Sequence, residues 1–329
     1  ADLNNAVAHN AVRNLTIDTG NGNPAAIGLD FCGANNSGIH NVAVVSGDGQ
    51  GVAGIDIRIC PTMGYHDDIT VRGFDCGVLM TPYHMTHNAF EFLTLEGQNK
   101  AGIQLNECST SLRKVHSVNR VPALEMTTNA AQAVVLDSRL EGRDGETPAI
   151  VAKQGHLFVR NVETPGYGAA IEPGVTALQV DEYVNGPVLS LRDGQAKESL
   201  NRPIEESPVL AWETDFSKWA NVDFYGATGD GKTDDATAVQ AALNSGKPVV
   251  CFPKAVYRLT SPVTVPATVQ RILAFYGSVN GQLLVAEDAP QPLLIEDIGT
   301  SSRTGVRHQA PRTLVLSHVR CSYANPNRQ

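Results

Sequence analysis

Short apolar segments recur along the first half of the chain in two interleaved series. The anchors of the first series are Leu15, Val42, Ile69, Leu93, Val115, Leu136 and Val159. The second series falls between them, and its anchors are Leu29, Ile55, Val78, Ile103, Leu124, Ile150 and Ile171. Both series have a period of 21–27 residues, which is typical of a solenoid whose coils cover one another's apolar faces.

These segments have the pattern of strands rather than helices. At 42–44, 69–71 and 93–95, apolar residues alternate with small or polar ones, as in a strand buried on one face. The segments are short, rich in β-branched residues and separated by Asn, Asp and Gly. A leucine-rich repeat is the competing solenoid, but its Leu-x-x-Leu-x-Leu consensus is absent. The pattern predicts an all-β fold, with a right-handed parallel β-helix over residues 1–184.

A small residue precedes every anchor of the second series. These residues are Gly28, Gly54, Gly77, Gly102, Ala123, Ala149 and Ala170. Glycine adopts backbone angles that are closed to other residues, so we expect the coil to turn a tight corner at this place.

The periodicity lapses at about Asn185. The stretch that follows contains Pro203, Trp212 and Trp219 without regular spacing, which indicates a linker (185–220) packed over a surface. New strand patterns occur at 222–224, 249–252, 257–259, 263–265, 283–285, 293–295 and 314–316. The sequence therefore predicts a second parallel β-helix (221–329) in tandem with the first.

A short helix at about 234–244 is expected to open this second β-helix. An apolar stripe at 238–243 follows an N-cap at Thr233 or Asp234, and Gly246 suits the end of the helix. Three acidic residues lie close together here, and we interpret them as turn and cap residues rather than a catalytic cluster: Asp230, Asp234 and Asp235.

The run Gly-Asp-Gly-Lys-Thr-Asp-Asp at 229–235, followed by Ala-Thr-Ala-Val-Gln-Ala-Ala-Leu, closely resembles the start of a pectate-lyase-superfamily β-helix. The resemblance implies that the helix closes the first coil, and it is specific for fold rather than chemistry. Because the run follows a finished β-helix, the tandem order resembles the exo-β-1,3-glucanases (laminarinases) and their bacterial relatives. The linker at 203–219 and the run Asn-Leu-Thr-Ile-Asp-Thr at 14–19 add to this resemblance, which covers most of the chain.

The resemblance also implies features that this sequence does not show. Members of that family begin with a Gly-Asp-Gly cap in their first β-helix and continue well past the second, so this chain looks truncated at both ends. Their proposed catalytic acid is a Glu in the second β-helix, and no motif here matches it. Open β-helix ends present unpaired backbone groups. We therefore expect self-association, or contact with missing parts of the protein, through these ends.

The chain is acidic and has no long apolar run. Its net charge of −9 argues against nucleic acid or an acidic polysaccharide as a partner, whereas a neutral polysaccharide meets no such objection. No run of about 18 apolar residues is present, so no membrane span is expected. The six cysteines are too scattered for a disulfide scaffold. Cys60 and Cys108, which the repeat places two coils apart, are interpreted as buried, inert thiols.

Carboxylates that neighbouring coils bring together are the candidates for catalysis, because a glycosidase needs an acid carboxyl and a second group that activates water or attacks the sugar. The catalytic candidates are Asp67, Glu91 and Glu107. The aromatic and imidazole side chains near them are candidates for sugar binding: Tyr65, His66, Tyr83 and His84. The alternative is that all of these are solvated turn residues. Their spacing matches no metal site, so neither a metal nor a cofactor is expected.

A second candidate group lies on or beside the other strand series. Gln104, Asn106 and Glu125 alternate with buried positions and are expected to point outward, where a β-helix binds glycans. Any solvated face would show the same pattern. The pairs at 287–288 and 296–297 each follow a strand and are interpreted as turns.

The functional prediction rests mainly on the resemblance. We predict a secreted protein, extracellular or periplasmic, that hydrolyses glycosidic bonds of a neutral β-glucan with carboxyl acid/base chemistry. Two alternatives remain open. One is a non-catalytic β-helix that binds glycans or has a structural role, and the other is a polysaccharide lyase.

Overall fold

The computed structural model describes residues 10–33, 37–57, 63–80, 87–186, 188–189, 194, 196–197, 199, 203–206, 208–210, 213–254, 256–274, 277–300, 305–317 and 319–321. The chain forms two compact units, residues 1–206 and 207–329. The expected boundaries at 184 and 221 stay predictions, as does the handedness of the coils.

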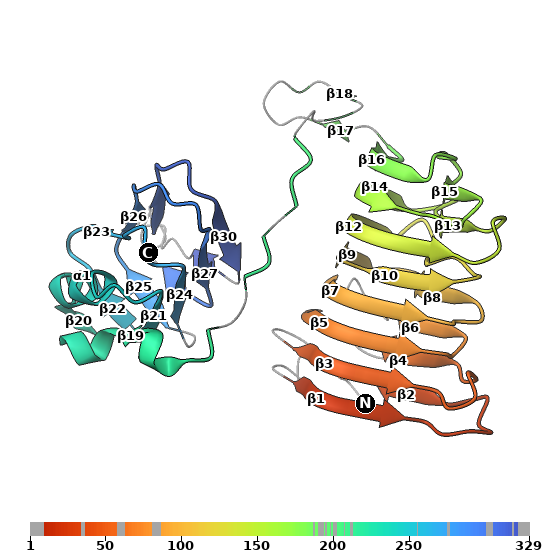
Figure 1. Cartoon of the computed structure of the whole chain (residues 1–329), viewed down its shortest axis with the longest axis horizontal. Coiled ribbons are helices and arrows are strands. Elements are labelled where there is room, and N and C mark those ends of the chain that lie inside the picture. The colour runs from red at the N-terminus through yellow and green to blue at the C-terminus, as the bar shows by residue number, and fades with distance from the viewer. Residues whose placement is uncertain are drawn as a thin grey trace, which may run out of the picture. The chain divides into compact units, whose positions relative to one another are not determined.

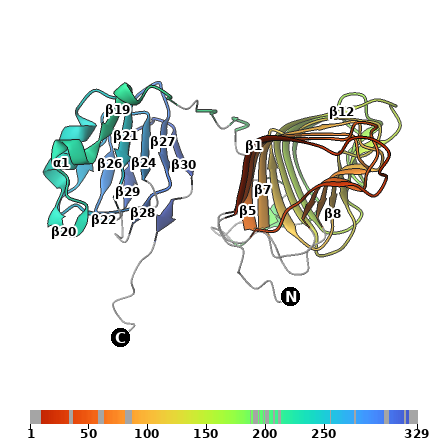
Figure 2. The same ribbon diagram turned by 90° about the horizontal axis from the view of Figure 1, so that it is seen from below.

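The first unit is a β-solenoid of two sheets whose strands stack from β1 toward β16 (Figure 1). Sheet I contains β1 (Ala11–Asp18), β3 (Gly38–Val45), β5 (Met63–Arg72), β7 (His87–Glu96), β9 (Ser109–Arg113), β10 (His116–Asn119), β12 (Gln132–Gly142), β14 (His156–Glu163) and β16 (Gln179–Val184). Sheet II contains β2 (Ile27–Asp30), β4 (Ala53–Ile57), β6 (Cys76–Met80), β8 (Ala101–Leu105), β11 (Leu124–Met126), β13 (Pro148–Val151) and β15 (Ala169–Glu172). All these strands pair in parallel except β16, which is antiparallel to β14. Figure 2 shows the stacked coils from below, with the two sheets enclosing one apolar core.

The pairing confirms the second strand series completely. Each of its seven anchors is the direct partner of the next, from Leu29 and Ile55 to Ile150 and Ile171. In the first series, Leu136 was the wrong anchor, and Val159 is in register with Val135 rather than with the row of Val115, which continues to Ser138 and Val162. Leu136 pairs with Arg113 and Arg160 on the outer face, while Val135 is buried beside it.

The cause of this slip is a bend that recurs once per coil in sheet I. The bend residues have φ between 47° and 57°, and they are Asn14, Asn41, Asp68, Phe92, Lys114, Asp137 and Asn161. Asn and Asp enter this left-handed region more readily than other non-glycine residues. Their side chains also bond between coils, as in Asn41 Nδ2 to Asn14 Oδ1 at 3.0 Å. The bend places two successive side chains outside, so strict alternation fails at Leu136.

The small residues before the anchors of sheet II have a different role from the one expected. Gly28, Gly54, Gly77 and Gly102 do not have positive φ. They are small because the coils approach closely there: a Cβ on Gly102 would lie 2.6 Å from the carbonyl oxygen of Ala123. The later coils have Ala at this place, so only the first four coils require glycine.

This close approach predicts a loss of stability in Gly102→Ala. The new methyl group would meet backbone atoms of Ala123 at 2.6, 3.1 and 3.2 Å, and backbone cannot rotate away as a side chain can. Overpacking of this kind costs about 1–3 kcal/mol, which a lower urea midpoint would report. Gly186→Ala is the matched control because no heavy atom lies within 4 Å of its added Cβ. Equal midpoints for the two variants would contradict the explanation.

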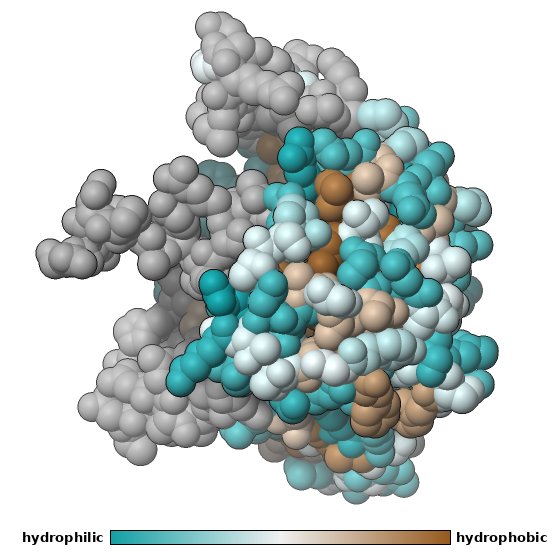
Figure 3. Space-filling model, turned by 90° about the vertical axis from the view of Figure 1, so that its left-hand side faces the viewer, coloured by the Kyte–Doolittle hydropathy of each residue, from teal (hydrophilic) through white to brown (hydrophobic). Residues whose placement is uncertain are grey.

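The second unit is also built from parallel strands. The first of its sheets contains β19 (Trp219–Asn221), β21 (Val249–Phe252), β24 (Arg271–Ala274), β27 (Leu293–Glu296) and β30 (Leu314–Ser317). The second contains β20 (Asp230–Asp234), β22 (Val256–Arg258), β25 (Ser278–Asn280), β28 (Gly299–Thr300) and β31 (Arg320–Cys321). The third contains β23 (Val263–Thr264), β26 (Leu283–Val285) and β29 (Val306–His308). Helix α1 (Ala236–Leu243) packs against its core. The expected helix and six of the seven expected strands are confirmed. On the face shown in Figure 3, hydrophobic residues are interspersed among hydrophilic ones.

The segment before α1 differs from expectation in three places, one of which is the N-cap, since the helix is preceded by Asp235 rather than by Thr233 or Asp234 as its cap. A 3-10 helix (Val222–Tyr225) replaces the expected strand at 222–224, and β20 runs through the expected turn. The three acidic residues are engaged by the chain itself, which agrees with their structural interpretation. Asp230 Oδ1 accepts from the backbone N–H groups of Lys232 and Thr233, and buried Asp235 accepts from Thr228 N at 2.6 Å.

Residues in the last part of the expected linker are engaged by neighbouring groups. The Trp219 ring nitrogen donates to the Glu213 carbonyl oxygen at 3.0 Å, and its ring contacts Phe216. The Leu210 carbonyl oxygen accepts from buried Arg271. Trp212 lies outside the described residues. The preceding part of the chain contains an antiparallel pair, β17 (Val188–Leu189) and β18 (Ala196–Lys197).

Candidate functional site: a groove across the coils

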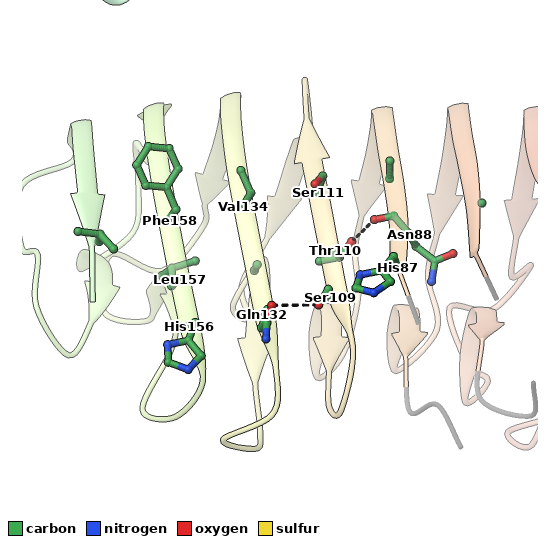
Figure 4. Close-up of a pocket in the computed structure, with 14 residues that line it drawn as sticks. His87, Asn88, Ser109, Thr110, Ser111, Gln132, Val134, His156, Leu157 and Phe158 are labelled. Atoms are coloured by element: carbon green, nitrogen blue, oxygen red, sulfur yellow. Dashed lines mark hydrogen bonds between the residues drawn. The ribbon is translucent and has the colours of Figure 1, made fainter. Parts of the chain in front are cut away.

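The outer face of sheet I contains a groove of about 390 Å³ that crosses the strands from β5 to β16. Two rows of outward side chains line it, one residue per coil (Figure 4). The polar row is His87, Ser109, Gln132 and His156. The floor row is Ala89, Ser111, Val134 and Phe158. Because each strand is in register with the next, both rows run along the axis of the solenoid.

The lining of this groove is neutral. None of its fourteen residues is Asp, Glu, Lys or Arg. Within the polar row, the Ser109 hydroxyl donates to Gln132 Oε1 at 3.2 Å. In the described part of the chain, the imidazoles of His87 and His156 have no hydrogen-bond partner, and both residues are exposed. The groove therefore offers neutral donors and acceptors beside a floor of small and apolar side chains.

A row of charged residues borders the floor row on the other side. Along β7, His87, Ala89 and Glu91 are successive outward residues, so Glu91 stands beside the floor. Its register partners are Asp67 on β5 and Arg113 on β9. Two of the three catalytic candidates, Asp67 and Glu91, are thus brought together on adjacent strands, which lie about 4.7–4.9 Å apart in any sheet.

Both oxygens of the Glu91 carboxylate are engaged. Tyr65 donates its hydroxyl to Oε2 at 2.5 Å, and Arg113 pairs with Oε1. Arg113 also lies 3.7 Å from Asp137 on the far side. Asp67 pairs instead with His40 on the preceding coil. Tyr65, an expected sugar-binding residue, therefore sits at this site as a donor to Glu91.

His66 lies on the opposite face of the same strand and is fully buried. Its ring stacks on Phe90 with centroids 4.6 Å apart, and its Nε2 is 3.0 Å from Asn88 Oδ1. Burial lowers the pKa of His66 to about 4, against a smaller opposing effect of the Asn88 hydrogen bond. This histidine is a neutral core residue and is not available to a ligand on the outer face.

The second expected group lies on another face of the solenoid. Gln104 and Glu125 are adjacent outward residues of sheet II, and Gln104 Nε2 donates to Glu125 Oε2 at 2.9 Å. Asn106 and the exposed Glu107 lie in the connection from β8 to β9. Glu107 is therefore two residues from Ser109 at the edge of the groove. Tyr83 and His84 fall outside the described residues.

Sequence reasoning missed the groove itself. Its polar row is formed by the first residue of four successive strands, His87, Ser109, Gln132 and His156. Those positions share the repeat period, so aligning the coils on polar residues as well as apolar anchors would have revealed the row. The small floor residues gave no such signal.

The cysteines divide into two kinds. Cys32 is disulfide-bonded, so the expectation of inert thiols does not extend to it. Cys76, Cys108 and Cys251 are free and buried, and burial raises the pKa of Cys76 to about 11. Cys60 lies outside the described residues.

No group of three His, Cys, Asp or Glu side chains in the described ranges is arranged to hold a metal ion. Within these ranges, no helix has the length and hydropathy needed to cross a bilayer.

Comparison with known proteins agrees with this architecture. Residues 219–281 match the family described as rhamnogalacturonase A/epimerase, pectate lyase-like. The β-solenoid fold and this match make the chain similar to pectate-lyase-like β-helix proteins and to exo-β-1,3-glucanases. It is 35% identical over 83 residues to a glucan 1,3-beta-glucosidase of Cochliobolus carbonum. That alignment covers 24% of this chain and 10% of the relative.

Proposed function

We propose that this chain belongs to a carbohydrate-active protein that binds a neutral β-glucan in the groove of sheet I and hydrolyses its glycosidic bonds. The observation that carries the proposal is the neutral lining of a groove that is bordered by two carboxylates in register. Sugar hydroxyls hydrogen-bond to neutral polar groups, and the apolar faces of pyranose rings pack on apolar side chains. A polyuronate would find no Lys or Arg among the lining residues. The similarity to a glucan 1,3-beta-glucosidase supports the same substrate class.

Asp67 and Glu91 pair with different residues, His40 and Arg113, and we assign them different roles. Glu91 receives hydrogen bonds from Tyr65 and Arg113, which stabilise its carboxylate form. Glu91 then attacks the anomeric carbon, while Asp67 donates a proton to the leaving glycosidic oxygen. Water, deprotonated by Asp67, releases the sugar from Glu91 in the second step. The spacing of adjacent strands is close to the 5–5.5 Å between carboxyl groups in retaining glycosidases.

The disulfide at Cys32 supports a location outside the cytoplasm. Disulfides persist in oxidising compartments such as the periplasm and the extracellular space. We therefore propose that the protein is secreted.

Product analysis tests the proposed reaction. The protein is incubated with laminarin, pectate and alginate, and soluble sugars are separated and quantified. Release of glucose or gentiobiose from laminarin alone is the expected result. An unsaturated product that absorbs ultraviolet light would show a lyase instead and overturn the proposed class.

A non-catalytic glycan-binding module is the second candidate. It is favoured by the engagement of both carboxylates in ion pairs, Asp67 with His40 and Glu91 with Arg113. Binding to immobilised laminarin without any product over days would establish it.

A further inference from the structure

The floor row of the groove has a pattern that bears on the length of its ligand. On five successive strands the in-register residues are Tyr65, Ala89, Ser111, Val134 and Phe158. Tyr65 and Phe158 are the two aromatic residues of this row, with three smaller residues between them, and Val184 on the antiparallel β16 follows Phe158. Four strand spacings separate the two aromatic residues, which is roughly 19 Å.

Each coil in this stretch repeats the same pair of contacts. Beside Ala89 stands His87, beside Ser111 stands Ser109, and beside Val134 stands Gln132, as Figure 4 shows for the labelled residues. A floor position for a ring face and a polar side chain for a hydroxyl therefore recur at every strand. The strand spacing of about 4.8 Å is close to the length of one pyranose ring.

We infer that the groove holds a glucan chain along the solenoid axis with one sugar ring per coil. Three rings lie over Ala89, Ser111 and Val134, and a fourth packs on Phe158 and reaches His156. Tyr65 closes the other end, where Glu91 and Asp67 stand beside the ring on Ala89. The inference rests on the proposed function, since it assigns the register of a ligand in the same groove.

The register predicts how affinity depends on chain length. Each ring adds about one net hydrogen bond and a ring contact, so affinity should rise by about fivefold per ring. The rise should stop at four rings, because a fifth ring would lie over Val184 of the antiparallel β16, beyond His156, where the polar row ends. Isothermal titration calorimetry with laminari-oligosaccharides of two to six units measures this directly, with the cello-oligosaccharide series in parallel.

Two variants locate the bound chain. Ser111→Leu fills the centre of the floor at an exposed position, and it should lower affinity for the tetrasaccharide by about tenfold. Thr94→Leu is the control, because Thr94 is outward on β7 but beyond the bend at Phe92, outside the groove. Circular dichroism of both variants checks that the fold is retained.

The outcomes separate the inference from the proposed function. A rise that ends at four rings, with loss in Ser111→Leu alone, supports the register. Affinity that is independent of length, or equal in both variants, overturns the register. If only the cello series shows the rise, the register stands and the proposed β-1,3 preference fails. If neither series binds at all, the proposed function fails and the register with it.

Discussion

Replacing Glu91 by Gln is expected to lower kcat on laminarin by about 10²–10⁴-fold, the range that a positioned acid, base or nucleophile contributes. The substitution keeps the size of the side chain but removes the negative charge that Arg113 and Tyr65 stabilise. Because the groove lining is untouched, the dissociation constant for laminari-oligosaccharides should change little. Initial rates and calorimetry on the same preparation measure both quantities.

Glu96→Gln is the matched control for this experiment. Glu96 is on the same strand, is outward, and pairs with Arg72 at 2.6 Å, so it also loses the charge of an ion pair. It lies beyond the bend at Phe92 and away from the groove. If Glu91→Gln and Glu96→Gln have the same activity, Glu91 has no part in catalysis. If Glu91→Gln changes affinity but no rate exists to change, the binding-module candidate is correct.

The apolar repeat was sufficient to predict the β-solenoid because every inward residue packs against the neighbouring coils in the same way. Ile55, Val78 and Ile103 each cover the coil before them, and a wrong register would expose all of them. Their spacing therefore records the pairing of the strands directly. The same reasoning found α1, whose buried face is set by residues such as Val239 and Leu243.

The bends of sheet I could not be predicted from the same pattern. Five of the seven bend residues are Asn or Asp, but Phe92 and Lys114 adopt the same backbone conformation. Phe and Lys rarely adopt a left-handed conformation, so their presence does not predict a bend. At Phe92 and Lys114 the neighbouring coils impose the bend. Asn and Asp are also frequent in ordinary turns. The positions of the bends therefore could not be predicted from single residues, and Leu136 was placed on the wrong face.

The candidate site was predicted in part, and its failures have one cause. Asp67 and Glu91 are 24 residues, or one period, apart and lie on adjacent strands, as expected in general for carboxylates from neighbouring coils. Whether a polar residue points outward depends on whether an odd or even number of residues separates it from the bend. The position of the bend could not be read from the sequence. His66 was for this reason expected at the surface, one residue from Asp67, although it faces the core.

The burial of His66 predicts a loss of stability in mild acid. Its pKa is about 4 in the folded protein, mainly because burial disfavours the charged imidazolium, and about 6.5 in an unfolded chain. Between these values the unfolded state binds the additional proton, so the free energy of unfolding falls as the pH falls. The slope is about 1.4 kcal/mol per pH unit, and the loss from pH 6.5 to pH 4 is about 3 kcal/mol.

Urea unfolding at several pH values between 7 and 4 measures this slope. In His66→Phe the slope of the unfolding free energy against pH should decrease by the amount that corresponds to about one bound proton. This change in slope is independent of the stability lost because the Asn88 side chain and the Ile39 N–H have no partner in the variant. His156→Gln serves as the control for loss of an exposed histidine, because His156 is exposed and its imidazole has no hydrogen-bond partner in the described part of the chain; its slope is compared with that of His66→Phe. The same slope in wild type and His66→Phe would show that His66 is not the group that takes up the proton. Carboxyl groups with lowered pKa values, such as Asp230, reduce stability only below about pH 5, where the unfolded chain begins to protonate them. The slope between pH 6.5 and pH 5 therefore reports His66, and a loss confined to the region below about pH 5 would implicate the carboxylates and contradict the assignment to His66.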